Sequence, residues 1–174
     1  CALRWQPDVT DVTNVTLMES ATTPSDPHIR AVIVDLDGTM IDTLGDFEVA
    51  LNRTLDALDR PLVSRGDIER MVGKGSEHLI TSALVHGGLP VEAAQALLPR
   101  AWEAYQREYL AINGRHSEVY PGVKTGLATM AAMGLPMACL TNKPLAFAEQ
   151  LLEKKGLRDH FQHVFGGDSF EKKK

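Results

Sequence analysis

Residues 31–39 read Ala-Val-Ile-Val-Asp-Leu-Asp-Gly-Thr. The opening apolar run has the length and β-branched composition of a fully buried strand. Two aspartates follow it, and a buried ionised carboxylate has to be paired or bound to a metal. In open α/β sheets, ligands bind just outside the carboxyl ends of the strands. The stretch therefore predicts a parallel-sheet strand that carries Asp35 and Asp37 where such a sheet places its chemistry.

A turn is the alternative interpretation of the same residues. Asp-Gly is a strong hairpin signal, but residues 39–43 do not alternate into a returning strand. An EF-hand calcium loop requires a glutamate six residues after its glycine, and that position is Leu44. We therefore favour the strand end over the turn.

Composition limits the class of protein. The chain has 174 residues, of which 44% are hydrophobic and 24% charged, as is typical of globular domains. The formal net charge of −5 argues against nucleic acid as a partner. No stretch approaches the roughly 18 apolar residues of a membrane span. The two cysteines, Cys1 and Cys139, do not suggest a disulfide framework, and we expect a cytoplasmic protein with Cys139 in its core.

The chain beyond the first strand predicts helices, then an alternation of helices and strands. Residues 46–116 show only helical periodicity, and Ser64 and Ser76 are placed to cap two of these helices. Apolar runs at residues 136–140 and 163–165 are separated from each other by a predicted helix. This alternation is typical of a parallel sheet with right-handed crossovers.

These patterns predict an α/β protein in three parts. Residues 1–28 form an aperiodic, unstructured extension, and Met18 within it reads as the natural start. Residues 29–45 and 117–174 form the α/β core, and residues 46–116 form a helical insertion. The chain stops just after an apparent strand, so we expect the core to be truncated at its C-terminal end.

Polar side chains follow two of the predicted strands. They are Asp35 and Asp37 after the first strand, and Thr141, Asn142 and Lys143 after the second. The carboxyl ends of parallel strands share one edge of the sheet, so we expect these groups to converge. Carboxylates suit a hard cation such as Mg²⁺, and a hydroxyl, an amide and an ammonium suit phosphoryl oxygens. The pattern predicts a phosphate site beside Mg²⁺.

At this point the chain resembles a known family. Asp-Leu-Asp-Gly-Thr at residues 35–39, followed by Asp42, resembles the first motif of the haloacid-dehalogenase-like hydrolases. Thr-Asn-Lys at residues 141–143 looks like their second motif, and the helical insertion is similar to their small α-helical cap. The resemblance covers about residues 30–174. It implies a Rossmann-like parallel sheet of the haloacid-dehalogenase type with an inserted cap domain.

Within the family, the chain most resembles the phosphoglycolate phosphatases. The features that carry this resemblance are Tyr-Pro-Gly-Val at residues 120–123, Thr-Asn-Lys-Pro at residues 141–144 and Gly-Gly-Asp-Ser at residues 166–169. It implies hydrolysis of 2-phosphoglycolate to glycolate and phosphate. Another capped phosphatase and a β-phosphoglucomutase-like enzyme remain alternatives. In each case the partner is a small phosphorylated metabolite, and the protein is a monomer or a homodimer.

The resemblance also implies a role for each site residue. Asp35 would be the nucleophile that forms an aspartyl-phosphate, and Asp37 would be the general acid and then the general base. Mg²⁺ would bind the Asp35 carboxylate and the Asp37 backbone carbonyl. Thr141 and Asn142 would hold the transferring phosphate, with Lys143 as a further phosphate ligand.

Two further lysine positions are candidates. The family has a third-motif lysine that neutralises the phosphate, for which Lys174 is our first choice and Lys173 or Lys172 are alternatives; a solvated tail is the competing interpretation. Lys74 follows Gly73 in the cap, where it is placed to meet a substrate carboxylate. A Walker A loop is excluded there because its first glycine is missing and Gly75, not serine or threonine, follows Lys74.

One departure from the family pattern concerns the metal. The family's fourth motif, Gly-Asp-x-x-x-Asp, supplies further carboxylates for Mg²⁺, and it is not among these 174 residues. We therefore expect this chain by itself to bind Mg²⁺ poorly and to have little activity. A non-catalytic fragment is the corresponding alternative. We also expect the strand at residues 31–34 to be an exposed edge, which favours aggregation.

Overall fold

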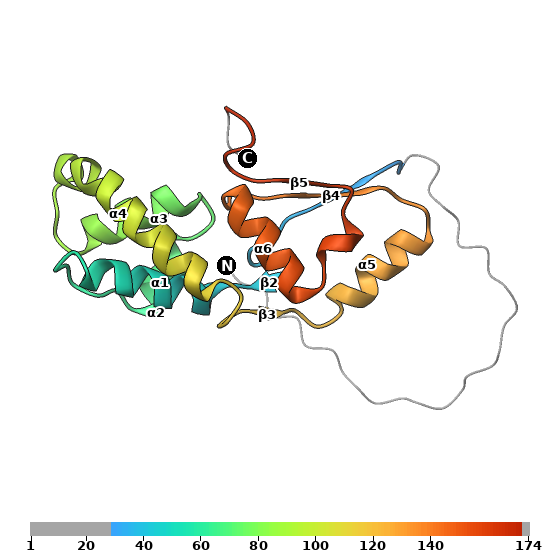
Figure 1. Cartoon of the computed structure of the whole chain (residues 1–174), viewed down its shortest axis with the longest axis horizontal. Coiled ribbons are helices and arrows are strands. Elements are labelled where there is room, and N and C mark those ends of the chain that lie inside the picture. Colours follow the sequence, from blue (N-terminus) through green and yellow to red (C-terminus); the bar gives the residue numbers. More distant parts are fainter. Residues whose placement is uncertain (1–28, 172–174) are drawn as a thin grey trace, which may run out of the picture.

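The structure is a computed structural model that describes residues 29–171 (Figure 1). Its main sheet has three parallel strands in the order β1-β4-β5. These are β1 (Val32–Val34), β4 (Met137–Leu140) and β5 (His163–Phe165). The parallel α/β prediction is confirmed. Within the described residues β1 is an edge strand, as expected, and Ile33 in it is 67% exposed.

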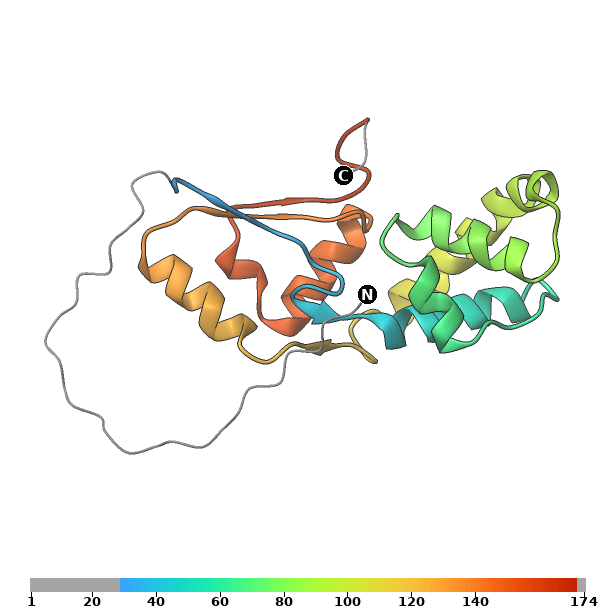
Figure 2. The ribbon, with the colours of Figure 1, turned by 180° about the vertical axis from the view of Figure 1, so that it is seen from behind.

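Two helices cover one face of this sheet. Figures 1 and 2 show α5 (Val123–Ala132) and α6 (Leu145–Lys155) on the same side of it, and the 3-10 helix η1 (Arg158–His160) leads into β5. Cys139 is fully buried among the apolar side chains of this layer, as predicted. The buried members of this core are Leu36, Met40, Ile41, Leu127, Met137, Cys139, Ala148, Leu151, Leu152, Leu157, Phe161 and Val164.

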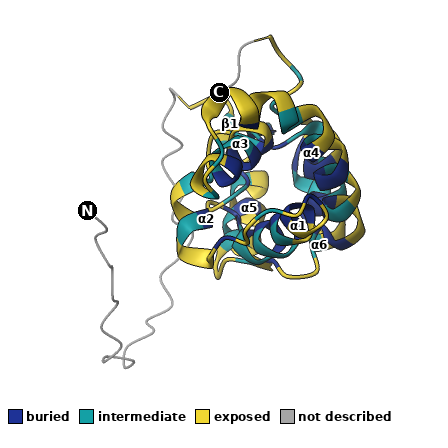
Figure 3. Cartoon of the chain, turned by 90° about the vertical axis from the view of Figure 1, so that its left-hand side faces the viewer, coloured by how far each residue is buried: buried dark blue, intermediate teal, exposed yellow. Residues whose placement is uncertain are grey.

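Four helices form a second core beside the sheet. They are α1 (Leu44–Asp56), α2 (Arg65–Met71), α3 (Ser76–His86) and α4 (Val91–Ile112). Figure 3 views the molecule from this end, where the buried residues of the helices face one another. No helix of the described residues is both long and apolar enough to cross a lipid bilayer.

Helix starts in this unit agree with the sequence in one case and differ in another. Ser64 caps α2, and its hydroxyl accepts the backbone N–H of Asp67, as predicted. The expected cap at Ser76 is wrong by one residue, because Ser76 is already helical and Gly75 is the N-cap. Gly75 has φ 91°, a left-handed conformation that favours glycine over serine.

A short antiparallel pair was missed by the sequence patterns. β2 (Ile41–Asp42) pairs with β3 (Glu118–Val119) and not with β1, so residues 39–43 hold a short strand that does not return along the first one. A tight turn precedes β2, in which Gly38 has φ 75° and its N–H donates to the carbonyl of Ile41. The Asp-Gly pair thus marks a turn, as its signal indicates, and this turn lies a few residues after the end of β1. Two residues per strand are too few to produce an alternating pattern.

Two chain segments join the two cores, one at the start of α1 and one after α4, and hydrogen bonds hold them together. Asp46 in the first turn of α1 is fully buried, and its carboxylate accepts the N–H groups of Gly114 at 2.7 Å and His116 at 2.8 Å. A Cβ on the neighbouring Gly45 would lie 2.3 Å from the carbonyl oxygen of His116, so only glycine allows this approach. From the other side, the ammonium of Lys155 in α6 donates to the carbonyl of Gly114 at 2.9 Å. The junction is thus tied to both α1 and α6.

We expect Asp46→Ala to lower the free energy of unfolding by about 2–3 kcal/mol, because two backbone N–H groups lose their acceptor. Urea denaturation followed by circular dichroism measures the change. Asp56→Ala is the matched control, since Asp56 is an exposed carboxylate on the same helix, and it should change stability by less than about 0.5 kcal/mol. Equal losses in the two variants would contradict this account of the junction.

Candidate active site

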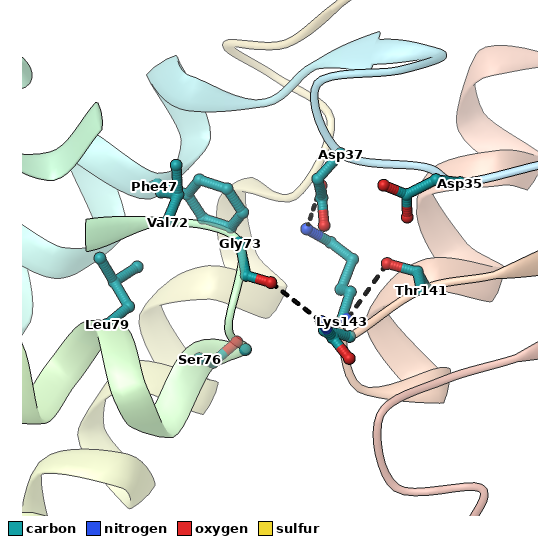
Figure 4. A pocket seen from close by; sticks show the side chains of 11 residues that line it. Asp35, Asp37, Phe47, Val72, Gly73, Ser76, Leu79, Thr141 and Lys143 are labelled. Carbon is teal, nitrogen blue, oxygen red and sulfur yellow. Dashed lines mark hydrogen bonds and ion pairs between the residues drawn. The ribbon is translucent and has the colours of Figure 1, made fainter. Parts of the chain in front are cut away.

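The polar side chains that follow β1 and β4 meet at a cavity between the two cores (Figure 4). The cavity has a volume of about 230 Å³. Strand ends supply its polar side and the helical unit supplies most of its apolar side. The lining residues are Asp35, Asp37, Phe47, Val72, Gly73, Gly75, Ser76, Leu79, Thr141, Asn142 and Lys143. All five strand-end residues named from the sequence therefore line one cavity.

Asp37 is held by two donors on the same oxygen. Its Oδ1 accepts the Thr43 hydroxyl at 2.8 Å and the Lys143 ammonium at 2.8 Å. The Lys143 side chain is only 1% exposed, while that of Asp37 is 22% exposed. Lys143, expected as a phosphate ligand, thus has a carboxylate as its immediate partner. Sequence reasoning missed Thr43, whose only signal is a hydroxyl shortly after the first motif.

Asp35 and Thr141 lie next to this pair. Figure 4 shows the Asp35 carboxylate beside Asp37 and Thr141 at the cavity. Thr141 is 2% exposed, and its hydroxyl accepts the backbone N–H of Lys143 at 3.2 Å, which fixes the start of the loop after β4. The hydroxyl proton remains available to donate to a ligand oxygen, because a hydroxyl both donates and accepts.

Asn142 links the sheet to the helical unit. Its side-chain nitrogen donates to the carbonyl oxygen of Gly73 at 2.9 Å. Gly73 belongs to the loop between α2 and α3, so this hydrogen bond crosses the cavity entrance from one core to the other. The loop itself places Gly73 and Gly75 against the cavity.

The Gly-Gly-Asp-Ser motif packs directly against the loop after β4. A Cβ on Gly167 would lie 2.4 Å from the carbonyl oxygen of Asn142, and one on Gly166 would lie 2.3 Å from the nitrogen of Leu145. Asp168 accepts the N–H of Leu145 at 2.8 Å, at the first residue of α6. The motif therefore positions the second-motif loop by close backbone packing.

Of the candidate lysines outside this loop, the structure describes Lys74, which does not reach the cavity. Lys74 is exposed and does not line the cavity, although its neighbours Gly73 and Gly75 do. Residues 172–174, which include Lys174 as first choice for the third motif, lie outside the described residues, as do residues 1–28 with Met18.

The acidic groups suit a partial metal shell. Within residues 29–171, no cluster of three or more His, Cys, Asp or Glu side chains is placed to hold a metal ion. Mg²⁺ in phosphoryl-transfer sites is commonly held by one or two carboxylates, with waters and substrate phosphate completing its shell. Asp35 and Asp37 fit that limited role.

Comparison with known proteins assigns the family. The model of the haloacid dehalogenase-like hydrolases matches residues 29–174. The chain belongs to this family. Family membership agrees with the parallel sheet and with the acidic residues at its edge.

Its relatives in this family include curated bacterial enzymes and solved structures. The phosphoglycolate phosphatase of Nitrosospira multiformis is 40% identical over 146 residues, which are 84% of this chain and 64% of that enzyme. The phosphoglycolate phosphatase of Thiobacillus denitrificans is 38% identical with the same coverage. A crystal structure of a predicted phosphoglycolate phosphatase from Haemophilus somnus superposes with a TM-score of 0.72 at 26% identity, covering 84% of this chain and 66% of that one. The chain thus spans just under two thirds of the length of these curated relatives.

Two tyrosines behind the cavity have unusual ionisation properties. Tyr105 and Tyr109 are fully buried, and the Tyr109 hydroxyl has no hydrogen-bond partner within the described residues. Burial raises the pKa of both phenols well above the ordinary value, and the nearby negative charge of Asp37 raises it further. Tyr120 is 38% exposed, and partial burial together with Asp42 also raises its pKa.

Alkaline titration tests this arrangement. Because the folded state favours the neutral phenols, the unfolded chain loses these protons first, so stability is unaffected below about pH 10 and falls as the pH rises above it. We expect tyrosinate absorbance to show one reversible ionisation in the native protein, from Tyr120. Tyr105 and Tyr109 should ionise only together with the loss of the far-ultraviolet circular dichroism signal. Three tyrosines titrating in the native protein near pH 10 would contradict the buried placement.

Proposed function

We propose that this chain carries the catalytic centre of a phosphatase that hydrolyses a small phosphomonoester, in the first place 2-phosphoglycolate. The observation that carries the proposal is the meeting of two strand-end aspartates with Thr141 and a buried lysine in one small cavity. The names of the relatives from Nitrosospira multiformis and Thiobacillus denitrificans support the substrate. We also expect the protein to act in the cytoplasm as a monomer or homodimer.

The reaction follows from the two aspartates. An Asp35 oxygen attacks phosphorus, an O–P bond forms, and the bond between phosphorus and the ester oxygen breaks. Asp37, in its protonated form, gives its proton to the departing alkoxide, so that glycolate leaves as an alcohol. Asp37 then takes a proton from a water molecule that attacks the aspartyl-phosphate. Inorganic phosphate leaves, and the Asp35 carboxylate and the Asp37 acid are restored.

Other residues orient the phosphoryl group and the acid. Thr141 and Asn142 provide a hydroxyl and an amide for phosphoryl oxygens, while Thr43 and Lys143 fix one oxygen of Asp37. The second oxygen of Asp37 then carries the transferable proton. Bound Mg²⁺, held by Asp35 and the Asp37 carbonyl, would neutralise charge on the phosphate.

Cavity size supports a small substrate. A volume of about 230 Å³ leaves room for a phosphoryl group and a short leaving group. The loop from Gly73 to Ser76 forms one side, and Lys74, which lies outside the cavity lining, is our proposed contact for a substrate carboxylate that extends beyond the cavity. An extended sugar phosphate fits this closed arrangement less well than a two-carbon acid.

Substitution of the two aspartates separates their roles. We expect Asp35→Asn and Asp37→Asn each to lower kcat for 2-phosphoglycolate by at least about 1,000-fold, measured by phosphate release. Asp56→Asn, at an exposed carboxylate of α1, should keep full activity. The assays use the product of the complete reading frame that contains this chain.

A trapping experiment identifies the nucleophile. With a radiolabelled aryl phosphate, whose leaving group needs no proton, acid quenching should recover labelled protein from Asp37→Asn, because hydrolysis of its aspartyl-phosphate lacks a base. Asp35→Asn should yield none. Label on the Asp35→Asn protein would assign the nucleophile elsewhere, and full activity of either variant would refute the proposed mechanism.

A further inference from the structure

Lys143 is an unusual residue because its charge is buried between the two cores. Its side chain is 1% exposed, and its ammonium forms an ion pair with Oδ1 of Asp37 at 2.8 Å. Burying an ammonium removes its hydration, and a single ion pair does not generally repay that cost. A stable buried lysine at this position therefore needs further favourable interactions for the charge.

Two aromatic rings supply these interactions. The Nζ atom of Lys143 lies over the ring of Phe47 at 4.5 Å from the centroid and over the ring of Tyr109 at 4.8 Å. Both distances are within the range in which the negative face of an aromatic ring attracts a cation, and the attraction is strongest where water is excluded. The ammonium thus has a carboxylate on one side and ring faces on the other.

The rings are held in place by their own packing. Tyr109 is fully buried, with its ring centroid 5.5 Å from that of Tyr105 and 4.8 Å from that of Phe147. Phe47 is 8% exposed, and its centroid lies 5.8 Å from that of Tyr109. Neither ring can turn away from the ammonium without opening this aromatic cluster.

The contact also joins different parts of the chain. Phe47 lies on α1 and Tyr109 on α4, both in the helical unit, while Lys143 and Asp37 follow strands of the sheet. The helical unit therefore reaches the acid–base group through the lysine.

We propose that Phe47 and Tyr109 are positioning residues whose ring faces hold the Lys143 ammonium against Asp37 and so fix the orientation of the acid–base carboxyl. The catalytic part of this inference rests on the proposed phosphatase function. Lys143 accordingly acts through Asp37, and its placement depends on the helical unit being packed against the sheet. Leucine at either ring position would fill space but offer no attraction to the charge.

The ring contact is tested by NMR on the 174-residue chain with ¹³C-labelled lysine. Ring currents shift the ε-methylene signal of a lysine that lies over aromatic faces, and Lys143→Arg identifies that signal. We expect the shifted signal in the unsubstituted chain and in Tyr109→Phe, which keeps the ring. We expect it to move toward the other lysines in Phe47→Leu and in Tyr109→Leu. Circular dichroism confirms folding of each variant.

The catalytic consequence is tested by kinetics on the complete gene product. Phe47→Leu and Tyr109→Leu should each lower kcat about tenfold, the loss expected for a desolvated cation–π contact, while KM changes by less than about twofold. Tyr109→Phe should restore kcat relative to Tyr109→Leu. Trp102→Leu is the control, because Trp102 stacks on Tyr105 in the same cluster, whereas the ammonium lies over the rings of Phe47 and Tyr109.

The outcomes distinguish the two proposals. An unshifted lysine signal in the unsubstituted chain, or an equal loss of kcat in Trp102→Leu, overturns the positioning role. So does an unchanged kcat in leucine variants that have lost the shifted signal. A shifted signal in a gene product that hydrolyses no phosphomonoester overturns the phosphatase proposal and the catalytic role of the rings with it, while the ring contact itself stands.

Discussion

The pairing of Asp37 with Lys143 is the interaction on which the site depends. It joins the residues that follow two neighbouring strands, across 106 positions of the sequence. The Lys143 ammonium is almost fully buried, and a buried ion without polar partners costs several kcal/mol. The strands must therefore be parallel and adjacent for the pair to form, and the helical unit must cover it. The same ion pair therefore limits both the arrangement of the strands and the chemistry of the cavity.

Most of the fold could be predicted from local patterns of apolar and polar residues. The apolar run before Asp35 and the second run before Thr141 each ended in polar residues, and that signal is enough to predict a shared sheet edge. The helices between the two runs could also be predicted, from the helical spacing of their apolar residues. The family whose model matches the chain is the one that its sequence resembles.

What the sequence did not disclose are contacts between distant residues. Asp46 looks like an ordinary acidic residue of a first helical turn, yet it binds backbone groups some 70 positions away. Thr43 and the β2–β3 pair are similar cases. The hydrogen bond from Thr43 to Asp37 and the pairing of β2 with β3 form only once the chain has folded. The contacts of Lys143 could not be predicted for the same reason: its neighbours in sequence indicate a phosphate loop, and only the fold brings a carboxylate and two rings to its ammonium.

The close packing beneath the second-motif loop limits which sequences this fold accepts. Even a single methyl group at Gly166 or Gly167 would overlap backbone atoms, which cannot move aside as a side chain can. Gly126, in contrast, faces open space and can be replaced without a clash. Glycine at the two constrained positions is therefore exchangeable only together with a displacement of Asn142 and the start of α6. Among homologous chains, substitutions should concentrate at glycines such as Gly126, where an added side chain meets no other atoms.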